Sequence, residues 1–171
     1  MNSGSLVVTG GTFTSTSGTL LFTTGALTSN FTQVTFGAGA TIATNSGTVQ
    51  FNCYSTWASD QTVTIDVPNN FAFNNLVFHQ NAASNNNLVT YAPVSGRTIV
   101  VQGNLTHGAG VYASASGISK LGGLWDLRGN LAIGSDAVGG VGNISLTGAA
   151  AQTITSHSTG LTCDLTVNKT G

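Results

Sequence analysis

Short clusters of apolar and β-branched residues recur along the first half of the chain at a nearly constant interval. Their centres lie 13 to 15 residues apart, and segments containing Gly or Asn separate them. Weaker strand-like pieces fall between the clusters, so the underlying step is near seven residues, which is one short strand and one turn. The clusters are residues 6–8, 20–22, 34–36, 49–51, 63–65 and 76–78.

A step of this length favours a β-solenoid. In such a fold a coil of three short strands uses about 21 residues and stacks on the next coil at ~4.8 Å. Glycines at the breaks, such as Gly10 and Gly18, adopt positive φ at low cost, and Asn tolerates left-handed corners. Alternation in residues 61–67 places Val63 and Ile65 inward. The prediction is therefore an all-β parallel β-solenoid with short strands and Gly/Asn turns. An antiparallel β-sandwich is the alternative, because it also uses short strands and turn residues.

The composition favours strands and self-association. Strong helix formers other than Ala and Leu are scarce, because the chain has two Lys, one Met and no Glu, while Thr, Val, Ile and Phe are abundant. Only nine residues are charged, and the net charge is −1. Ordinary globular domains carry about 25% charged residues, which help to keep copies apart. We therefore expect copies of the chain, or adjacent repeats, to associate.

Two classes of partner are not expected. The four cationic residues are scattered and form no stripe that could follow a phosphate backbone, which argues against nucleic acid. No apolar run approaches the ~18 residues that a membrane span needs. The cations are Arg97, Lys120, Arg128 and Lys169.

One repetitive β domain is expected over residues 1–171, built in part from a duplicated unit. The segment 47–80 is echoed by 142–171, and the middle at 80–97, with its Asn-rich run, looks irregular. Residues 47–51, 61–65 and 74–78 form a series that residues 142–146, 152–155 and 163–167 repeat in the same order.

Three short motifs carry a resemblance to a known class of repeats. They are G-x-[LIV]-x-[LF] at residues 142–146, Q-T-[IV]-T at 152–155, and the run D-L-T-V-N-K-T-G at 164–171. In these motifs the chain resembles tandem repeats of large bacterial surface proteins, namely adhesins similar to filamentous haemagglutinin and autotransporter passengers. The resemblance implies a right-handed parallel β-helix, an extracellular or cell-surface location, and a structural or adhesive role.

Residues for catalysis, or for holding a metal or cofactor, are sparse. The carboxylates form no pair suited to act as acid and base, and the histidines lie 28 and 50 residues apart without metal-ligand spacing. Each histidine is expected in a turn or on the surface, and Asp126 is expected to form a surface ion pair with Arg128. The chain is therefore predicted not to be an enzyme and to need no cofactor or metal. The carboxylates are Asp60, Asp66, Asp126, Asp136 and Asp164, and the histidines are His79, His107 and His157.

The leading prediction is a non-enzymatic extracellular structural module that self-assembles or continues in tandem in a fibre, sheath or surface adhesin. It follows because an exposed strand at each end of a solenoid is a template for another module. The alternative is a carbohydrate-binding or carbohydrate-cleaving β-helix module that recognises surface glycans. Exposed aromatic rings would serve that alternative by stacking on sugars, and burial is the competing expectation for both tryptophans. The candidates for sugar stacking are Trp57, Trp125, Tyr54 and Tyr112.

Two interpretations of the cysteines stay open, a disulfide and two separate apolar residues. Cys53 and Cys163 are separated by 110 residues and show no metal-binding spacing. They are candidates for a disulfide in an oxidising compartment, within one chain or between neighbouring subunits. Otherwise they are two separate small apolar residues.

Overall fold

A computed structural model describes residues 5–15, 17–26, 31–44, 46–54, 60–69, 71–81, 88–108, 118–134, 137, 142–157 and 163–169. Within these ranges the chain forms sixteen β-strands, and no helix there is long and apolar enough to cross a membrane. Every strand pair found among them is parallel. The predicted parallel β-solenoid is confirmed, and the antiparallel sandwich is excluded.

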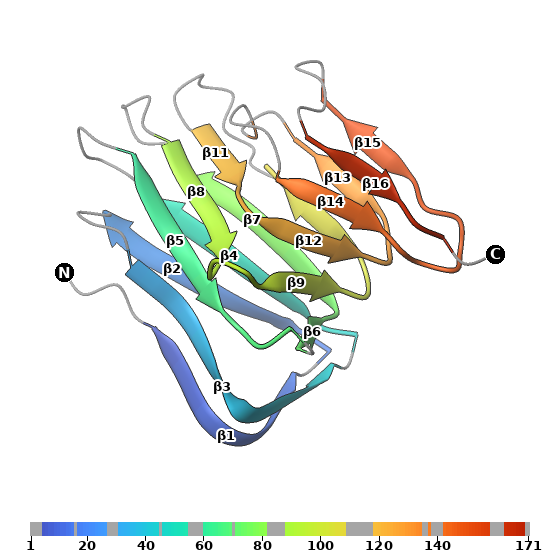
Figure 1. Ribbon diagram of the computed structural model, residues 1–171. Coiled ribbons are helices and arrows are strands. Elements are labelled where there is room, and N and C mark those ends of the chain that lie inside the picture. Colours follow the sequence, from blue (N-terminus) through green and yellow to red (C-terminus); the bar gives the residue numbers. More distant parts are fainter. Residues whose placement is uncertain are drawn as a thin grey trace.

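The strands stack into three parallel sheets, which we name faces A, B and C (Figure 1). Face A contains β1 (Leu6–Ser15), β3 (Phe31–Thr44), β5 (Gln61–Asp66), β8 (Leu88–Pro93) and β11 (Ile118–Leu121). Face B contains β2 (Thr19–Ala26), β4 (Thr48–Tyr54), β7 (Asn75–Asn81), β10 (Leu105–His107), β13 (Leu131–Ile133) and β15 (Ile154–Ser156). Face C contains β6 (Ala72–Phe73), β9 (Thr98–Val101), β12 (Leu124–Leu127), β14 (Asn143–Leu146) and β16 (Leu165–Val167).

One coil takes more residues than the seven-residue step predicts. Leu6 pairs with Val34 on face A, and Leu20 pairs with Val49 on face B, so equivalent residues lie 28 and 29 positions apart. The expected coil of about 21 residues is therefore wrong for this part of the chain. Successive apolar clusters, 13 to 15 residues apart, alternate between faces A and B, so two clusters make one coil.

The first two coils contain long bent strands in place of separate short ones. β1 and β3 lose register between Val8 and Gly10, where β3 has one residue more than β1. A Cβ atom on Gly37 would lie 2.8 Å from the carbonyl oxygen of Thr9, so this position accepts only glycine without a shift. The bulge bends both strands, and their second halves turn toward the side of face C (Figure 1).

Side chains of the same kind form columns inside the coils, because parallel pairing in register places equivalent residues above one another. On face B, Phe22, Phe51 and Phe78 form one column, with neighbouring ring centroids 5.2 Å apart and interplanar angles of 14° and 9°. The next positions in this column are His107 and Ile133, and both are buried. The expectation that His107 lies in a turn or on the surface is wrong, because its place in β10 points it inward.

Asparagine side chains join successive coils at the corner that leads into face B. Asn75 Oδ1 accepts a hydrogen bond from the backbone N–H of Asn104 at 2.8 Å, and Asn104 Oδ1 accepts one from the N–H of Asn130 at 3.1 Å. Asn130 Oδ1 continues the series with the N–H of Thr153 at 2.8 Å. These bonds supply acceptors for backbone donors at the corner. They explain the Gly-Asn pairs that precede β10 and β13.

The glycine before two of these asparagines is required by the closeness of the coils. A Cβ atom on Gly129 would lie 2.1 Å from the carbonyl oxygen of Gly103, and one on Gly103 would lie 2.4 Å from Oδ1 of Asn75. No side chain fits at either position unless the neighbouring coil moves. The third Gly-Asn pair, Gly142-Asn143, lies at a different corner, at the start of β14 on face C.

The structure places parts of the segment 80–97 and of the predicted duplicated unit on particular strands. Residues 88–93 form β8, a regular strand that pairs with β5 and β11, so the segment 80–97 is not irregular throughout. The predicted duplication places its two copies on different faces. The segment 47–51 contains the first residues of β4 on face B, and its echo at 142–146 contains β14 on face C.

Replacing Asn104 by Ala removes one link in the asparagine series. We expect the free energy of unfolding to fall by about 1 kcal/mol, the usual net contribution of such a hydrogen bond. Urea denaturation followed by circular dichroism measures the change. The control is Asn143→Ala, at an exposed asparagine outside the series, and it should change the value by less than about 0.5 kcal/mol. Equal losses in both variants would contradict the bridging role.

Replacing Gly129 by Ala tests the close approach of the coils. The added Cβ would collide with the backbone of Gly103, so we expect the variant to lose at least about 2 kcal/mol of stability. Gly39→Ala is the matched control in β3, since a Cβ there would meet no atom within 4 Å. Thermal denaturation should separate the two variants clearly, and a Gly129→Ala protein as stable as the control would refute the packing argument.

Candidate functional site

Three of the described carboxylates link coils, and the described carboxylates do not converge on a metal site. Asp60 accepts a hydrogen bond from the backbone N–H of Leu88, in the next coil, at 3.0 Å. Asp66, at the other end of β5, forms an ion pair with Arg97 of the next coil. Among the described residues, no group of His, Cys, Asp and Glu is arranged to hold a metal ion. Asp136 lies outside those residues.

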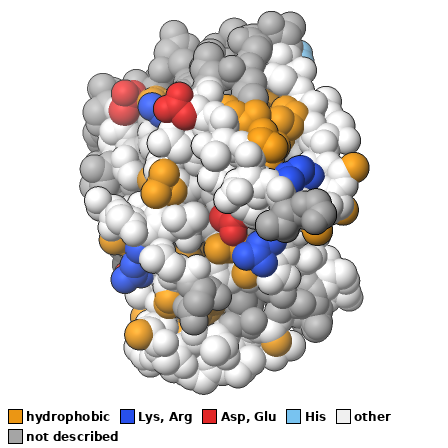
Figure 2. All heavy atoms as spheres, turned by 45° about the vertical axis from the view of Figure 1, so that its right-hand side comes forward, with side chains coloured by type: hydrophobic (Ala, Val, Ile, Leu, Met, Phe, Trp, Pro, Cys, Tyr) orange, Lys and Arg blue, Asp and Glu red, His pale blue; other side chains and the backbone are white. Residues whose placement is uncertain are grey.

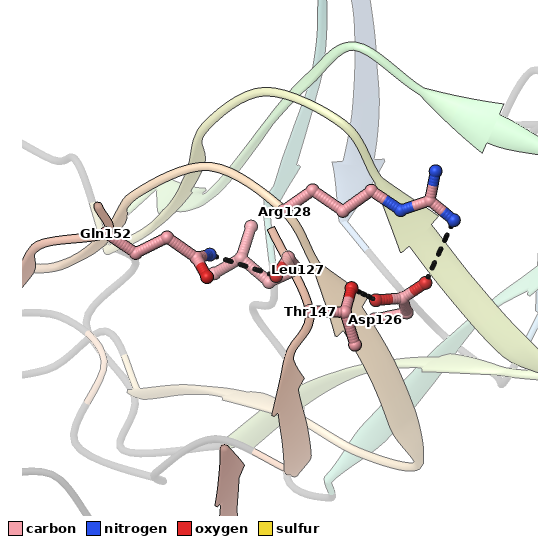
Figure 3. A network of polar contacts seen from close by, with 5 residues as sticks. All are labelled: Asp126, Leu127, Arg128, Thr147 and Gln152. Atoms are coloured by element: carbon pink, nitrogen blue, oxygen red, sulfur yellow. Dashed lines mark hydrogen bonds and ion pairs between the residues drawn. The ribbon is translucent and has the colours of Figure 1, made fainter. Parts of the chain in front are cut away.

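A larger polar cluster, shown in Figure 3, joins β12 to the following coil. Asp126 forms the expected ion pair with Arg128, with 3.3 Å between Oδ2 and Nη2, and it accepts a hydrogen bond from the hydroxyl of Thr147. Gln152 donates from Nε2 to the carbonyl oxygen of Leu127 at 3.0 Å. The predicted ion pair is confirmed, and its carboxylate also bonds the coil that follows.

Trp125 presents no ring face to a ligand, so its assignment to sugar stacking is wrong. Its side chain is 1% exposed, and its indole N–H donates to the carbonyl oxygen of Gly122 at 2.8 Å. The ring packs edge-on against Phe78, with the centroids 5.4 Å apart. Burial, the competing expectation, is confirmed for Trp125. The side chain points inward because Trp125 follows the outward Leu124 in β12, and successive side chains of a strand alternate. The side chains of the other candidates lie outside the description: Tyr54, Trp57 and Tyr112.

The predicted disulfide within the chain is not formed. Cys163 carries a free thiol and is partly buried beside β16, at the C-terminal end of the stack. Cys53 lies in β4, which is four steps of about 4.8 Å from β15 at that end. A disulfide needs its two Cα atoms within about 7 Å of each other. Burial raises the pKa of the Cys163 thiol, and the neighbouring Asp164 carboxylate raises it further.

Strands and core side chains remain uncovered, within the described structure, at the two ends of the stack. We name β1 and β2 the N-terminal edge, and β15 and β16 the C-terminal edge. Each of these four strands pairs with a described strand on one side only. Such a strand offers a row of free backbone donors and acceptors, which is a template for another strand.

Inward side chains at the N-terminal edge are only partly buried. Leu6, Phe13, Leu20 and Phe22 form part of the lining of a small apolar hollow. The described part of this coil, residues 5–15 and 17–26, contains no charged residue and no proline. It therefore lacks two of the devices with which proteins keep edge strands from pairing.

Inward side chains at the C-terminal edge are more exposed. Leu165 occupies the column position of Trp125 and Ile144, yet it is 39% exposed because no described coil covers it. Ile154, which follows Leu131 in a face B column, is partly buried. Figure 2 brings this side of the molecule forward and shows hydrophobic side chains gathered in one area, with charged side chains scattered around it.

Exposed end strands were expected from the solenoid prediction, but the residues that form them were not. Identifying them requires the pairing register, since inward residues of an end strand have the same local pattern as inward residues of a middle strand. The candidate site is therefore the pair of edges, and none of the sequence-predicted sugar-stacking residues is described as part of it.

The raised pKa of Cys163 predicts slow thiol chemistry. The thiolate is the reacting form, so alkylation at pH 8 should be several-fold slower than in the urea-unfolded chain and should speed up as the pH rises past the ordinary value of 9.0. Asp164→Asn removes the smaller cause and should speed alkylation at pH 8. Mass spectrometry in a Cys53→Ser background measures both rates. Equal rates for folded and unfolded protein at pH 8 would contradict the raised pKa.

Comparison of the chain with models of protein families, with curated proteins and with solved structures found no match in any of the three. The resemblance to repeats of bacterial surface proteins stays a prediction from short motifs. The parallel solenoid and its two edges are the features on which a functional proposal can be based.

Proposed function

We propose that the chain is a structural module without enzymatic activity that extends end to end through its terminal coils. It would join copies of itself, or adjacent repeats, in a fibre, sheath or surface adhesin. The observation that carries the proposal is the pair of edges. Each edge combines strands paired on one side with inward side chains that are incompletely buried.

Adding a strand at either edge would extend the sheets and the apolar core that already join the coils. The free backbone groups would gain partners, and the inward side chains would lose contact with water. Complete burial of a leucine contributes about 1.5–3 kcal/mol relative to full exposure. Leu165, at 39% exposure, therefore has part of that stabilisation left to gain.

The sides of the stack favour a structural role over recognition of a ligand. Asp60, Asp66 and Asp126, which a binding or catalytic site could use, bond the next coil. Trp125 is in the core. Three aromatic candidates for the carbohydrate-binding alternative have side chains outside the description. No described contact favours that alternative.

An extracellular or cell-surface location belongs to the same proposal. A chain with nine charged residues and a net charge of −1 has little repulsion to keep copies apart, which suits a packed fibre or surface layer. The short motifs that resemble repeats of bacterial surface proteins support the same location.

Two leucine variants test the proposal at the C-terminal edge. Leu165 and Leu124 are both on face C and are 39% and 44% exposed, but Leu165 lies in an end strand and points inward, whereas Leu124 points outward from a middle strand. Leu165→Lys would place a charge in the contact, so oligomers should become at least about tenfold weaker, the loss that about 1.4 kcal/mol represents. Leu124→Lys should leave assembly unchanged.

Sedimentation velocity over a concentration series, with negative-stain electron microscopy, measures the assembly. Elongated wild-type oligomers that Leu165→Lys reduces in size and Leu124→Lys does not are the expected result. Wild-type protein that stays monomeric at millimolar concentration would overturn self-assembly. A glycan array run beside it would then identify the carbohydrate-binding alternative.

A further inference from the structure

We infer that two copies of the chain join N-terminal edge to N-terminal edge about a two-fold axis. In this arrangement β2 pairs antiparallel with β2 of the second copy, and β1 pairs with β1 in the same way. The inference rests on the proposed self-association and adds to it which edge meets which. It follows from the shape of the ends, the direction of their backbone groups, and the side chains that the pairing would bring together.

The two ends of the described stack differ in shape. Face A ends at β11, whereas face B continues for one further coil to β15, and face C continues to β16, beyond that coil. Among the described strands, the C-terminal edge is therefore stepped. At the N-terminal edge, β1 and β2 belong to the same first coil, so faces A and B end level. A level end cannot follow a stepped end closely on every face, but two level ends can meet.

Backbone groups in β2 have a known direction. The carbonyl oxygen of Gly18 accepts a hydrogen bond from the N–H of Thr48 in β4 at 3.0 Å, so Gly18 faces β4. Backbone groups of alternate residues in a strand point to opposite sides. The residues of β2 whose backbone groups face the free edge are therefore Thr19, Leu21 and Thr23.

In an antiparallel pair centred on Leu21, the edge-facing residues of β2 lie opposite the edge-facing residues of β2 in the second copy. Leu21 lies opposite Leu21 of the second copy, and Thr19 lies opposite Thr23. All of these residues direct their backbone groups to the edge, so each opposite pair can exchange two hydrogen bonds. Between them, the inward Leu20 meets Phe22 of the second copy, which continues the apolar core across the junction.

The first strand supports the same axis. Val7, in β1, is 58% exposed and Leu21 is 51% exposed, and these are the exposed large apolar side chains of the described first coil. They lie 14 positions apart, which is half of the 28-residue offset between Leu6 and Val34. In the inferred arrangement one two-fold axis passes close to both, so each side chain would meet its own copy.

Repulsion between like charges does not oppose this contact. A two-fold interface brings identical surfaces together, so a charged residue near the axis would face the same charge. The described residues of the first coil include none. The partly buried Leu20 and Phe22 of the two copies would instead meet across the junction.

Single-cysteine variants of the full chain, in a Cys53→Ser, Cys163→Ser background, test the axis. Across an antiparallel hydrogen-bonded pair the Cα atoms are about 5.5 Å apart, which a disulfide can bridge. Mild oxidation of Leu21→Cys should give covalent dimers and nothing larger, in at least about tenfold higher yield than Leu124→Cys, because the contact raises the effective concentration of the thiols. Equal yields from the two variants would overturn the inference.

A mixing experiment fixes direction and register. Thr19→Cys and Thr23→Cys should each give little dimer alone, since like positions would lie about 13 Å apart in the antiparallel pair. The mixture should give heterodimers, because position 19 lies opposite position 23. Circular dichroism of each variant must match the wild type, and Cys→Ala replacements provide a second background if the Ser variants lose their β-sheet spectrum.

Failure of the axis and failure of the proposed function give different results. If wild-type oligomers form, Leu21→Cys gives no dimer, and mixing it with Thr155→Cys does, then copies join head to tail. In that case the two-fold inference is overturned and the proposed function stands. If wild-type protein stays monomeric and no variant forms cross-links, both are overturned.

Discussion

In-register parallel stacking of one coil on the next is the constraint on which the rest of this structure depends. Because each strand pairs with the equivalent strand one coil away, each inward position is packed against the same position in its neighbours. The column of Phe22, Phe51 and Phe78 on face B, with rings 5.2 Å apart, is the direct result. The same rule places His107 in the core, since its position in the column and not its chemistry decides where it points.

In-register stacking also constrains the corners, where it limits how closely the backbones of neighbouring coils can approach. Glycine is required where the neighbouring coil lies within contact distance, as at Gly129. Asparagine supplies an acceptor for a backbone N–H at a corner, as Asn104 does for Asn130. Charged residues are few, and several bond the neighbouring coil: Asp60, Asp66 and Asp126 each do so. The polar chemistry of the described chain is thus used largely to hold coils together, which fits a structural role.

The candidate site lies where the described stacking ends. A coil in the middle has neighbours on both sides, whereas the coils at the two edges have a described neighbour on one side only. Backbone groups and inward side chains that would be satisfied elsewhere are therefore available at β1, β2, β15 and β16. The two edges are not equivalent, because one is level and uncharged and the other is stepped. This difference between the described edges is one basis of the inferred two-fold contact.

The sequence by itself determined the local structure of this protein. β-branched clusters, alternation within strands such as Val63 and Ile65, and glycine and asparagine at breaks reflect preferences of neighbouring residues, so the all-β solenoid could be predicted from them. Tertiary structure alone decided the coil length, the burial of Trp125 and His107, and the separation of Cys53 from Cys163. Each of these depends on which strands lie side by side in the folded chain, and a seven-residue pattern does not specify that pairing. The edges that form the candidate site depend on the same pairing, so they became identifiable only in the folded chain.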